Sequence, residues 1–239
     1  MKLTIGVDFD NTIACYDTAF SVVARELGLL DSPNALSKSQ IKEIVLARLG
    51  GDVDWKILQG QVYGKFIHLA TVFPGFMEFV YRSKLKGHSV FIVSHKSEYG
   101  HFDNTKVNLR DAAVSWMAQN GIIGPDGVAL RQSEIFFEST RREKIARIRA
   151  LGCTHFIDDL QEVLGDPLFP EWTERILFSP DSSVKFEGGS TIETSWQTLE
   201  TNLFRNSHSD ESRRVQQSRF ARKPVSKVVD FPSGSKRGV

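Results

Sequence analysis

The sequence predicts an α/β protein built around a doubly wound, mostly parallel β-sheet, with a small helical insertion and a disordered basic C-terminal tail. Short apolar runs rich in β-branched and aromatic residues alternate with longer stretches whose apolar residues recur at helical spacing, which predicts the sheet and its helices. The apolar pattern vanishes from about Arg205 onward, which predicts the tail. Ligands of such sheets bind beyond the carboxyl ends of the strands, so the residues that end each strand are the candidates for function.

The first apolar run, residues 3–7, is short and partly β-branched, as is typical of a buried strand in a parallel sheet. It ends in two carboxylates, Asp8 and Asp10, and Asn11 and Thr12 follow. Carboxylates this close repel each other unless a positive charge lies between them, and a hard cation with oxygen ligands fits. A strand end followed by an Asx turn would give the same pattern without a metal. The later strand ends therefore decide between these interpretations.

Residues 15–73 are predicted to form a helical insertion after the first strand. Three helices are expected: the first ends near residue 28, Ser37 caps the second, and Asp52 or Asp54 caps the third. The three helices either form a separate cap or cover one face of the sheet.

A later helix is predicted to begin at Thr140, because Thr140 and Glu143 fit a capping box. Lys144 then lies in the first turn of that helix, where unpaired N–H groups and a partial positive charge favour an anion. The helix dipole alone would favour a lysine at the other end, so a bound phosphate would explain its position. A solvated Lys144 beside Glu143 is the alternative.

Four more strands are predicted in the second part of the chain. One ends at Ser94, and another ends in the adjacent acids Asp158 and Asp159. The predicted strands lie at 89–93, 134–138, 155–159 and 175–178, with helices at 106–120 and from Thr194 onward.

In this order, the stretches resemble the motifs of the haloacid dehalogenase-like (HAD) hydrolases, the aspartyl-phosphate phosphatase superfamily. The stretch from Asp8 to Thr12 resembles the first motif, with Asn11 where many members have glycine. Asparagine tolerates the left-handed backbone that glycine would adopt there. Ser94, Lys144 and the pair Asp158 and Asp159 match the later motifs, so the resemblance spans roughly residues 1–200. It implies a Rossmann-like HAD core at 1–14 and 74–204, a helical cap at 15–73 and a tail at 205–239.

The resemblance also implies the roles of the site residues. Asp8 is expected to be the nucleophile and Asp10 the general acid and base. The phosphoryl group is expected to be held by Thr12, Ser94 and Lys144, and Mg²⁺ by Asp8, Asp10, Asp158 and Asp159, where Asp10 contributes its carbonyl and Asp159 is the first choice for direct ligation.

The expected function is Mg²⁺-dependent hydrolysis of a small phosphorylated metabolite, a sugar phosphate or a nucleotide, through an aspartyl-phosphate. A phosphotransferase or mutase of the same fold is one alternative, and a non-catalytic member that binds a phosphorylated ligand or a partner is another. The presence of every expected catalytic residue argues against the non-catalytic alternative. Asp10 argues against a dehalogenase, since that branch lacks the second acid of the first motif. The fold does not set the substrate, which depends on the cap and loops.

Charge and cysteine content limit which partners and which cellular compartment we expect. The chain has a net charge of +1, but from Arg205 onward nine Lys/Arg stand against three Asp/Glu, so the tail carries +6 and the remainder −5. The spread-out charges and few aromatics of the tail do not favour nucleic-acid binding, although they leave it open. Two cysteines do not make a disulfide framework, and no stretch is long and apolar enough for a membrane helix. We therefore expect a cytoplasmic protein with no membrane partner.

Overall fold

The computed structural model describes residues 2–31, 36–102, 104–124, 130–180 and 191–205. Lys2–Thr201 form one compact unit. The predicted tail lies, from residue 206 on, outside the described residues. Among the described residues no helix is long and apolar enough to cross a membrane.

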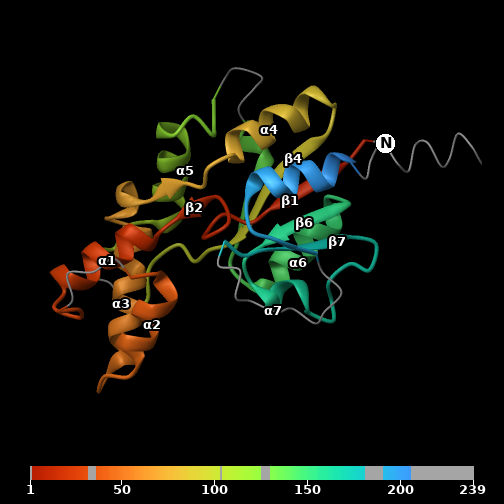
Figure 1. Ribbon diagram of the computed structural model, residues 1–239. Helices are drawn as coiled ribbons and strands as arrows, with labels where there is room; N and C mark the ends of the chain where they lie inside the picture. Colours follow the sequence, from red (N-terminus) through yellow and green to blue (C-terminus); the bar gives the residue numbers. More distant parts are fainter. Residues whose placement is uncertain (1, 32–35, 103, 125–129, 181–190, 206–239) are drawn as a thin grey trace, which may run out of the picture. The chain divides into compact units, whose positions relative to one another are not determined.

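A six-stranded sheet forms the centre of this unit (Figure 1), with the order β5-β4-β1-β6-β7-β8 and every neighbouring pair parallel. In chain order this is the doubly wound 3-2-1-4-5-6 arrangement, and the predicted fold class is confirmed. The order reverses between β1 and β6, so the crevice that such sheets use for ligands opens at the carboxyl ends of these two strands. The strands are β1 (Thr4–Val7), β4 (Ser89–His95), β5 (Ile135–Glu138), β6 (His155–Asp158), β7 (Glu174–Phe178) and β8 (Thr191–Glu193).

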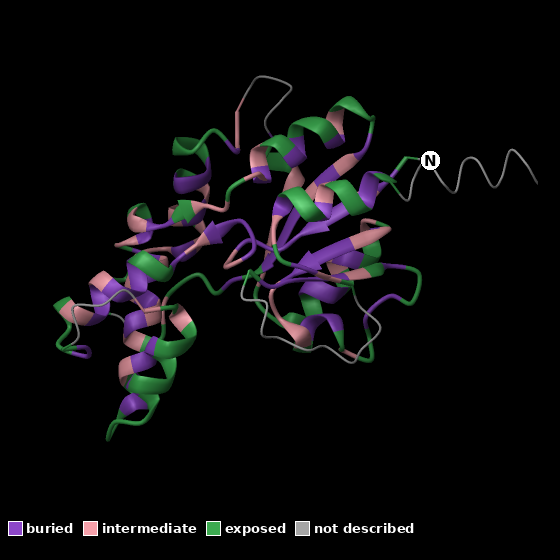
Figure 2. Ribbon diagram, viewed as in Figure 1, coloured by how far each residue is buried: buried purple, intermediate pink, exposed green. Residues whose placement is uncertain are grey.

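Helices pack on both faces of the sheet and bury its apolar residues. Figure 2 shows the strands largely buried, while the helices have one buried and one exposed side. The helices outside the insertion are α4 (Phe76–Leu85), α5 (Leu109–Gln119), α6 (Arg141–Ala150) and α7 (Gln161–Leu164), with a 3₁₀ turn η2 (Gln132–Glu134). One core cluster, between the sheet and α6 and α7, contains Val93, Ile145, Ile148, Cys153, Phe156, Val163, Leu164, Phe169 and Leu177.

The stretch between β1 and α4 is a helical insertion. A two-stranded antiparallel ribbon stands at its base, where Ala14 pairs with Val72 and Cys15 with Thr71. Aromatic rings hold its helices together: Phe20 stacks on Trp55 at 5.2 Å between ring centroids. The elements of the insertion are β2 (Ala14–Cys15), α1 (Asp17–Glu26), α2 (Lys38–Leu46), α3 (Gly51–Tyr63), the 3₁₀ turn η1 (Ile67–Leu69) and β3 (Thr71–Val72).

Two of the predicted helix starts are confirmed and two are wrong. Ser37 caps α2 and Thr140 caps α6, each in a complete capping box. The N-cap of α3 is Gly50, at φ 78°, rather than Asp52 or Asp54, because the chain turns in a left-handed conformation that glycine adopts without strain. The start of α5 is later than predicted, because Asn108 accepts hydrogen bonds from the first backbone N–H groups of that helix.

The sheet has one strand more than the sequence predicted. β8 pairs with β7 just before the short helical stretch that begins at Trp196. Its three residues are too few to show a periodic pattern, so only the pairing reveals the strand.

Candidate active site

The loop after β1 carries the first two acids. Asp8 continues the pairing of β1, since its backbone N–H donates to the Ile157 carbonyl at 2.9 Å. The loop then turns tightly, with Asn11 at φ 58° and its N–H bonded to the Ala14 carbonyl. Asn11 therefore occupies the left-handed conformation in which asparagine can replace glycine.

Lys144 lies between two carboxylates beneath this loop. Its Nζ is 2.6 Å from Asp8 Oδ1 and 2.7 Å from Asp158 Oδ2, and its side chain is fully buried. The capping box of Thr140 and Glu143 fixes the first turn of α6, from which Lys144 reaches the ends of β1 and β6. The solvated alternative is thus wrong for this lysine.

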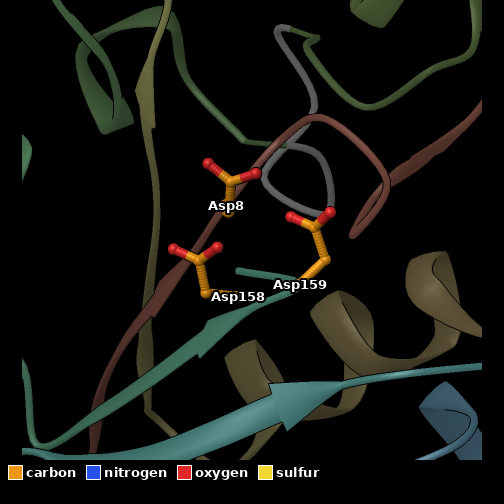
Figure 3. A group of neighbouring side chains, drawn as sticks. All are labelled: Asp8, Asp158 and Asp159. Atoms are coloured by element: carbon orange, nitrogen blue, oxygen red, sulfur yellow. The ribbon is translucent and has the colours of Figure 1, made fainter. Parts of the chain in front are cut away.

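Asp8, Asp158 and Asp159 converge from the carboxyl ends of β1 and β6 (Figure 3). Each offers a carboxylate oxygen, and these oxygens all lie within 4.8 Å of one another. Three carboxylates of this kind suit a hard divalent cation such as Mg²⁺ or Ca²⁺ rather than a soft metal.

Burial and mutual repulsion shift the pKa values of two of the acids in this cluster. Burial raises the pKa of Asp158 and that of Asp159, and the neighbouring negative charges raise both further. Burial opposes the charge of Lys144, but contact with Asp158 and Asp8 raises the pKa of its ammonium. A single lysine does not balance two buried carboxylates and a half-buried one, so the cluster fits an additional cation.

Asp10 faces a second lysine, Lys96, which directly follows β4. The Lys96 Nζ is 2.9 Å from Asp10 Oδ1 and 2.7 Å from Oδ2, and the Tyr16 hydroxyl donates to the same Oδ1 at 2.7 Å. Burial tends to raise the pKa of Asp10, but Lys96 and Tyr16 outweigh it, so the pKa is lowered. The carboxylate of Asp10 is therefore held ionised, next to the three-acid cluster.

Ser94 and Thr12, both expected to bind phosphate, are buried. The Thr12 carbonyl accepts a hydrogen bond from Trp196 Nε1 at 3.1 Å, and this bond anchors the loop that carries Thr12. The Thr12 Oγ1 is buried without a hydrogen-bond partner among the described residues. Buried hydroxyls are usually paired, so the Thr12 hydroxyl can still donate or accept a hydrogen bond.

Sequence reasoning missed Lys96 and Tyr16, which bond to Asp10. It also missed Lys38, which faces Asp159 and Asp10 at longer range, and Tyr63, whose ring lies 4.6 Å from Lys96 Nζ. Lys96 could have been found, since it follows a strand end two residues after Ser94. The other three come from the helical insertion. Lys38 directly follows the Ser37 cap, where the helix dipole disfavours a cation, and that was a usable signal. Nothing in the local sequence of Tyr16 or Tyr63 indicates its place at the site.

Comparison with solved structures places this fold in a known class. A HAD-superfamily hydrolase from Ehrlichia chaffeensis is 12% identical, with a TM-score of 0.51, over 86% of this chain and 98% of that chain. YfnB from Bacillus subtilis, a HAD-hydrolase by name and solved with bound magnesium, is 10% identical, with a TM-score of 0.51, over 84% of this chain and 98% of that chain. The protein therefore has the fold of the HAD-superfamily hydrolases.

Comparison at the level of sequence adds no relative. No protein-family model matches the chain, and no curated protein matches it.

Proposed function

We propose that the protein is a Mg²⁺-dependent phosphatase that hydrolyses a small phosphorylated metabolite, such as a sugar phosphate or a nucleotide, through an aspartyl-phosphate on Asp8. The observation that supports this best is the convergence of Asp8, Asp158 and Asp159 around one point beside the buried Lys144. The magnesium bound to YfnB supports the same choice of metal.

In the first step the Asp8 carboxylate attacks phosphorus while the bond from phosphorus to the leaving oxygen breaks. Lys144, Ser94 and Thr12 bind the phosphoryl oxygens, and the unpaired Thr12 hydroxyl has the donor that this needs. Mg²⁺ would be held by Asp8, Asp158, Asp159 and the Asp10 carbonyl. Among the two adjacent acids, Asp159 is the first choice for direct coordination. The metal would offset the negative charge that develops on the phosphoryl oxygens.

Asp10 transfers the protons of both steps. In the first step it gives a proton to the leaving oxygen, so it must first take one up from solvent, because Lys96 and Tyr16 favour its ionised form. In the second step it takes a proton from the water that attacks phosphorus, which frees Asp8 and releases inorganic phosphate. The contacts of Asp10 with Lys96 and Tyr16 favour the ionised form, which the second step requires.

We further propose that 1–14 and 74–204 form the catalytic core, that 15–73 form a cap and that 205–239 form a basic tail without a role in catalysis. The β2–β3 ribbon supports the boundaries of the cap. Cys15 and Cys153 are both free thiols, which suits a reducing compartment, and we propose the cytoplasm.

The test is turnover of 4-nitrophenyl phosphate by the purified full-length chain. We expect phosphate release that EDTA abolishes and added Mg²⁺ restores, because the acids need a cation to hold the substrate. Undiminished release in excess chelator would refute the metal-dependent mechanism. An absence of release from any ester in a metabolite panel would refute the phosphatase.

A further inference from the structure

The site has two layers that differ in exposure. Asp8, Asp158 and Lys144 are buried and form its floor. Asp10 and Asp159 are half-buried and form its rim. A substrate whose phosphoryl group rests on the floor must place its leaving group at the rim.

Two side chains of the helical insertion, Lys38 and Tyr63, reach this rim. Both are half-buried. The Lys38 Nζ lies 5.7 Å from the centroid of the Tyr63 ring and 5.6 Å from that of Phe20, and Lys38 also has a side-chain hydrogen bond with Tyr63. The Lys96 Nζ also lies near this ring, 4.6 Å from the same centroid. Tyr63 is therefore close to the lysine that contacts Asp10.

Lys38 differs from the other two lysines of the site in its pairing. Lys144 and Lys96 each contact a carboxylate at 2.7 Å or less. Lys38 makes no ion pair of that kind within the described part of the chain and faces Asp159 and Asp10 only at longer range. Of these three lysines, Lys38 is thus the one whose ammonium can bind a further anion.

The position of Lys38 in its helix needs a reason. It is the first residue of α2, directly after the Ser37 N-cap, where the helix dipole disfavours a cation. Burial opposes its charge, but Tyr63, Asp159 and Asp10 raise the pKa of the ammonium, so it stays charged at neutral pH. A cation bound by Asp159 would weaken that long-range attraction and leave Lys38 to an incoming anion.

We propose that Lys38 and Tyr63 recognise the leaving group, and that the substrate is a phosphate ester whose leaving group carries a second negative charge, either a carboxylate or another phosphate. This inference rests on the proposed phosphatase activity and specifies its substrate class. Lys38 supplies the charge, and Tyr63 supplies a hydroxyl and a ring that hold the ammonium in place.

Three esters with a three-carbon leaving group test the proposal: glycerol 3-phosphate, 3-phosphoglycerate and 1,3-propanediol bisphosphate. We expect the wild-type protein with Mg²⁺ to prefer the two charged esters in kcat/KM. Lys38→Met should lower kcat/KM for the charged esters about 10- to 100-fold more than for glycerol 3-phosphate, because a charge-assisted contact is lost. The better of the two charged esters identifies carboxylate or phosphate as the group recognised.

Lys42→Met is the matched control, since Lys42 is exposed on the same helix. It should leave the preference unchanged, and Tyr63→Phe should reduce it less than Lys38→Met. An equal loss on all three esters in Lys38→Met would overturn the proposal and show that Lys38 only balances Asp159 and Asp10.

Binding separates this proposal from the proposed activity. Calorimetric titration of Asp8→Asn protein with the same esters and Mg²⁺ requires no turnover. If the wild-type protein hydrolyses neither these esters nor any other in the metabolite panel, the phosphatase proposal fails, while tighter binding of the charged esters that depends on Lys38 would still support recognition at the rim. Equal binding of charged and neutral esters would overturn the inference.

Discussion

At the carboxyl edge of the sheet the candidate residues lie at or just after the ends of strands or in the first turn of α6, whereas the insertion reaches the site from the ends of its helices. Lys38 begins α2 and Tyr63 ends α3. The edge residues Asp8, Asp158 and Lys144 are buried and contact one another at 2.6–2.7 Å. The insertion residues Lys38 and Tyr63 are half-buried: Lys38 faces Asp159 and Asp10 at longer range, and the Tyr63 ring lies beside Lys38 and Lys96. This difference fits the division of roles that we propose, in which the edge of the sheet carries the chemistry and the insertion selects the substrate.

The strongest test of this comparison is Asp8→Asn. The change keeps the side-chain volume but removes the nucleophile, so no aspartyl-phosphate can form and turnover should fall to background with every ester. Steady-state assays and mass spectrometry of trapped protein measure both consequences. Wild-type turnover in Asp8→Asn would show that the nucleophile lies elsewhere.

Asp10→Asn should give a graded loss. With a poor leaving group, such as a sugar hydroxyl, we expect kcat/KM to fall about 10²–10⁴-fold, because proton transfer is lost. With 4-nitrophenyl phosphate the loss should be smaller, since that leaving group departs without a proton. An equal loss on both substrates would instead assign Asp10 a purely structural role.

The two buried lysines allow a comparison of stability. Lys144→Met leaves two buried carboxylates without a partner and should lower the free energy of unfolding by about 3–5 kcal/mol. Lys96→Met should cost less, because the Asp10 side chain is 18% exposed and retains its bond to Tyr16.

Urea unfolding of both variants measures this order. Added Mg²⁺ should recover part of the loss in Lys144→Met, since a bound cation replaces the missing charge. A Lys144→Met protein as stable as the wild type would contradict the interpretation that the lysine balances these acids.

The smallest effects should come from the two helix caps. Thr140→Ala and Ser37→Ala each remove a capping side chain and should cost about 1 kcal/mol of stability. Thr140→Ala should lower turnover of all esters, because α6 carries Lys144. Ser37→Ala should alter the preference between charged and neutral esters, because α2 carries Lys38. Thr140→Ser is the control that keeps the capping hydroxyl, and identical kinetic profiles for the two alanine variants would argue against separate roles of core and insertion.

The sequence was informative where local chemistry determines position. A carboxylate at a strand end lies at the edge of the sheet in any parallel fold, which is why Asp8, Asp158 and Asp159 were predicted together. The capping box likewise predicted the first turn that holds Lys144. Their catalytic and metal-binding roles stay predictions.

Tertiary packing determined the remainder. The approach of Lys38, Tyr63 and Tyr16 to the acids depends on how the insertion folds back, and no residue spacing encodes that. β8 was missed because its pairing with β7, rather than any pattern within it, makes it a strand.

The β2–β3 ribbon brings the two ends of the helical insertion together, which bears on how the insertion can be replaced. Ala14 and Val72 are paired neighbours although 58 positions separate their numbers, so the chain departs from the sheet and returns to it at the same place. Helices of other lengths could be spliced in between these paired residues while β1 and α4 keep their connections to the rest of the sheet. We therefore expect that a different insertion grafted onto the same ribbon would change the substrates accepted, as long as it keeps Tyr16, which bonds to Asp10.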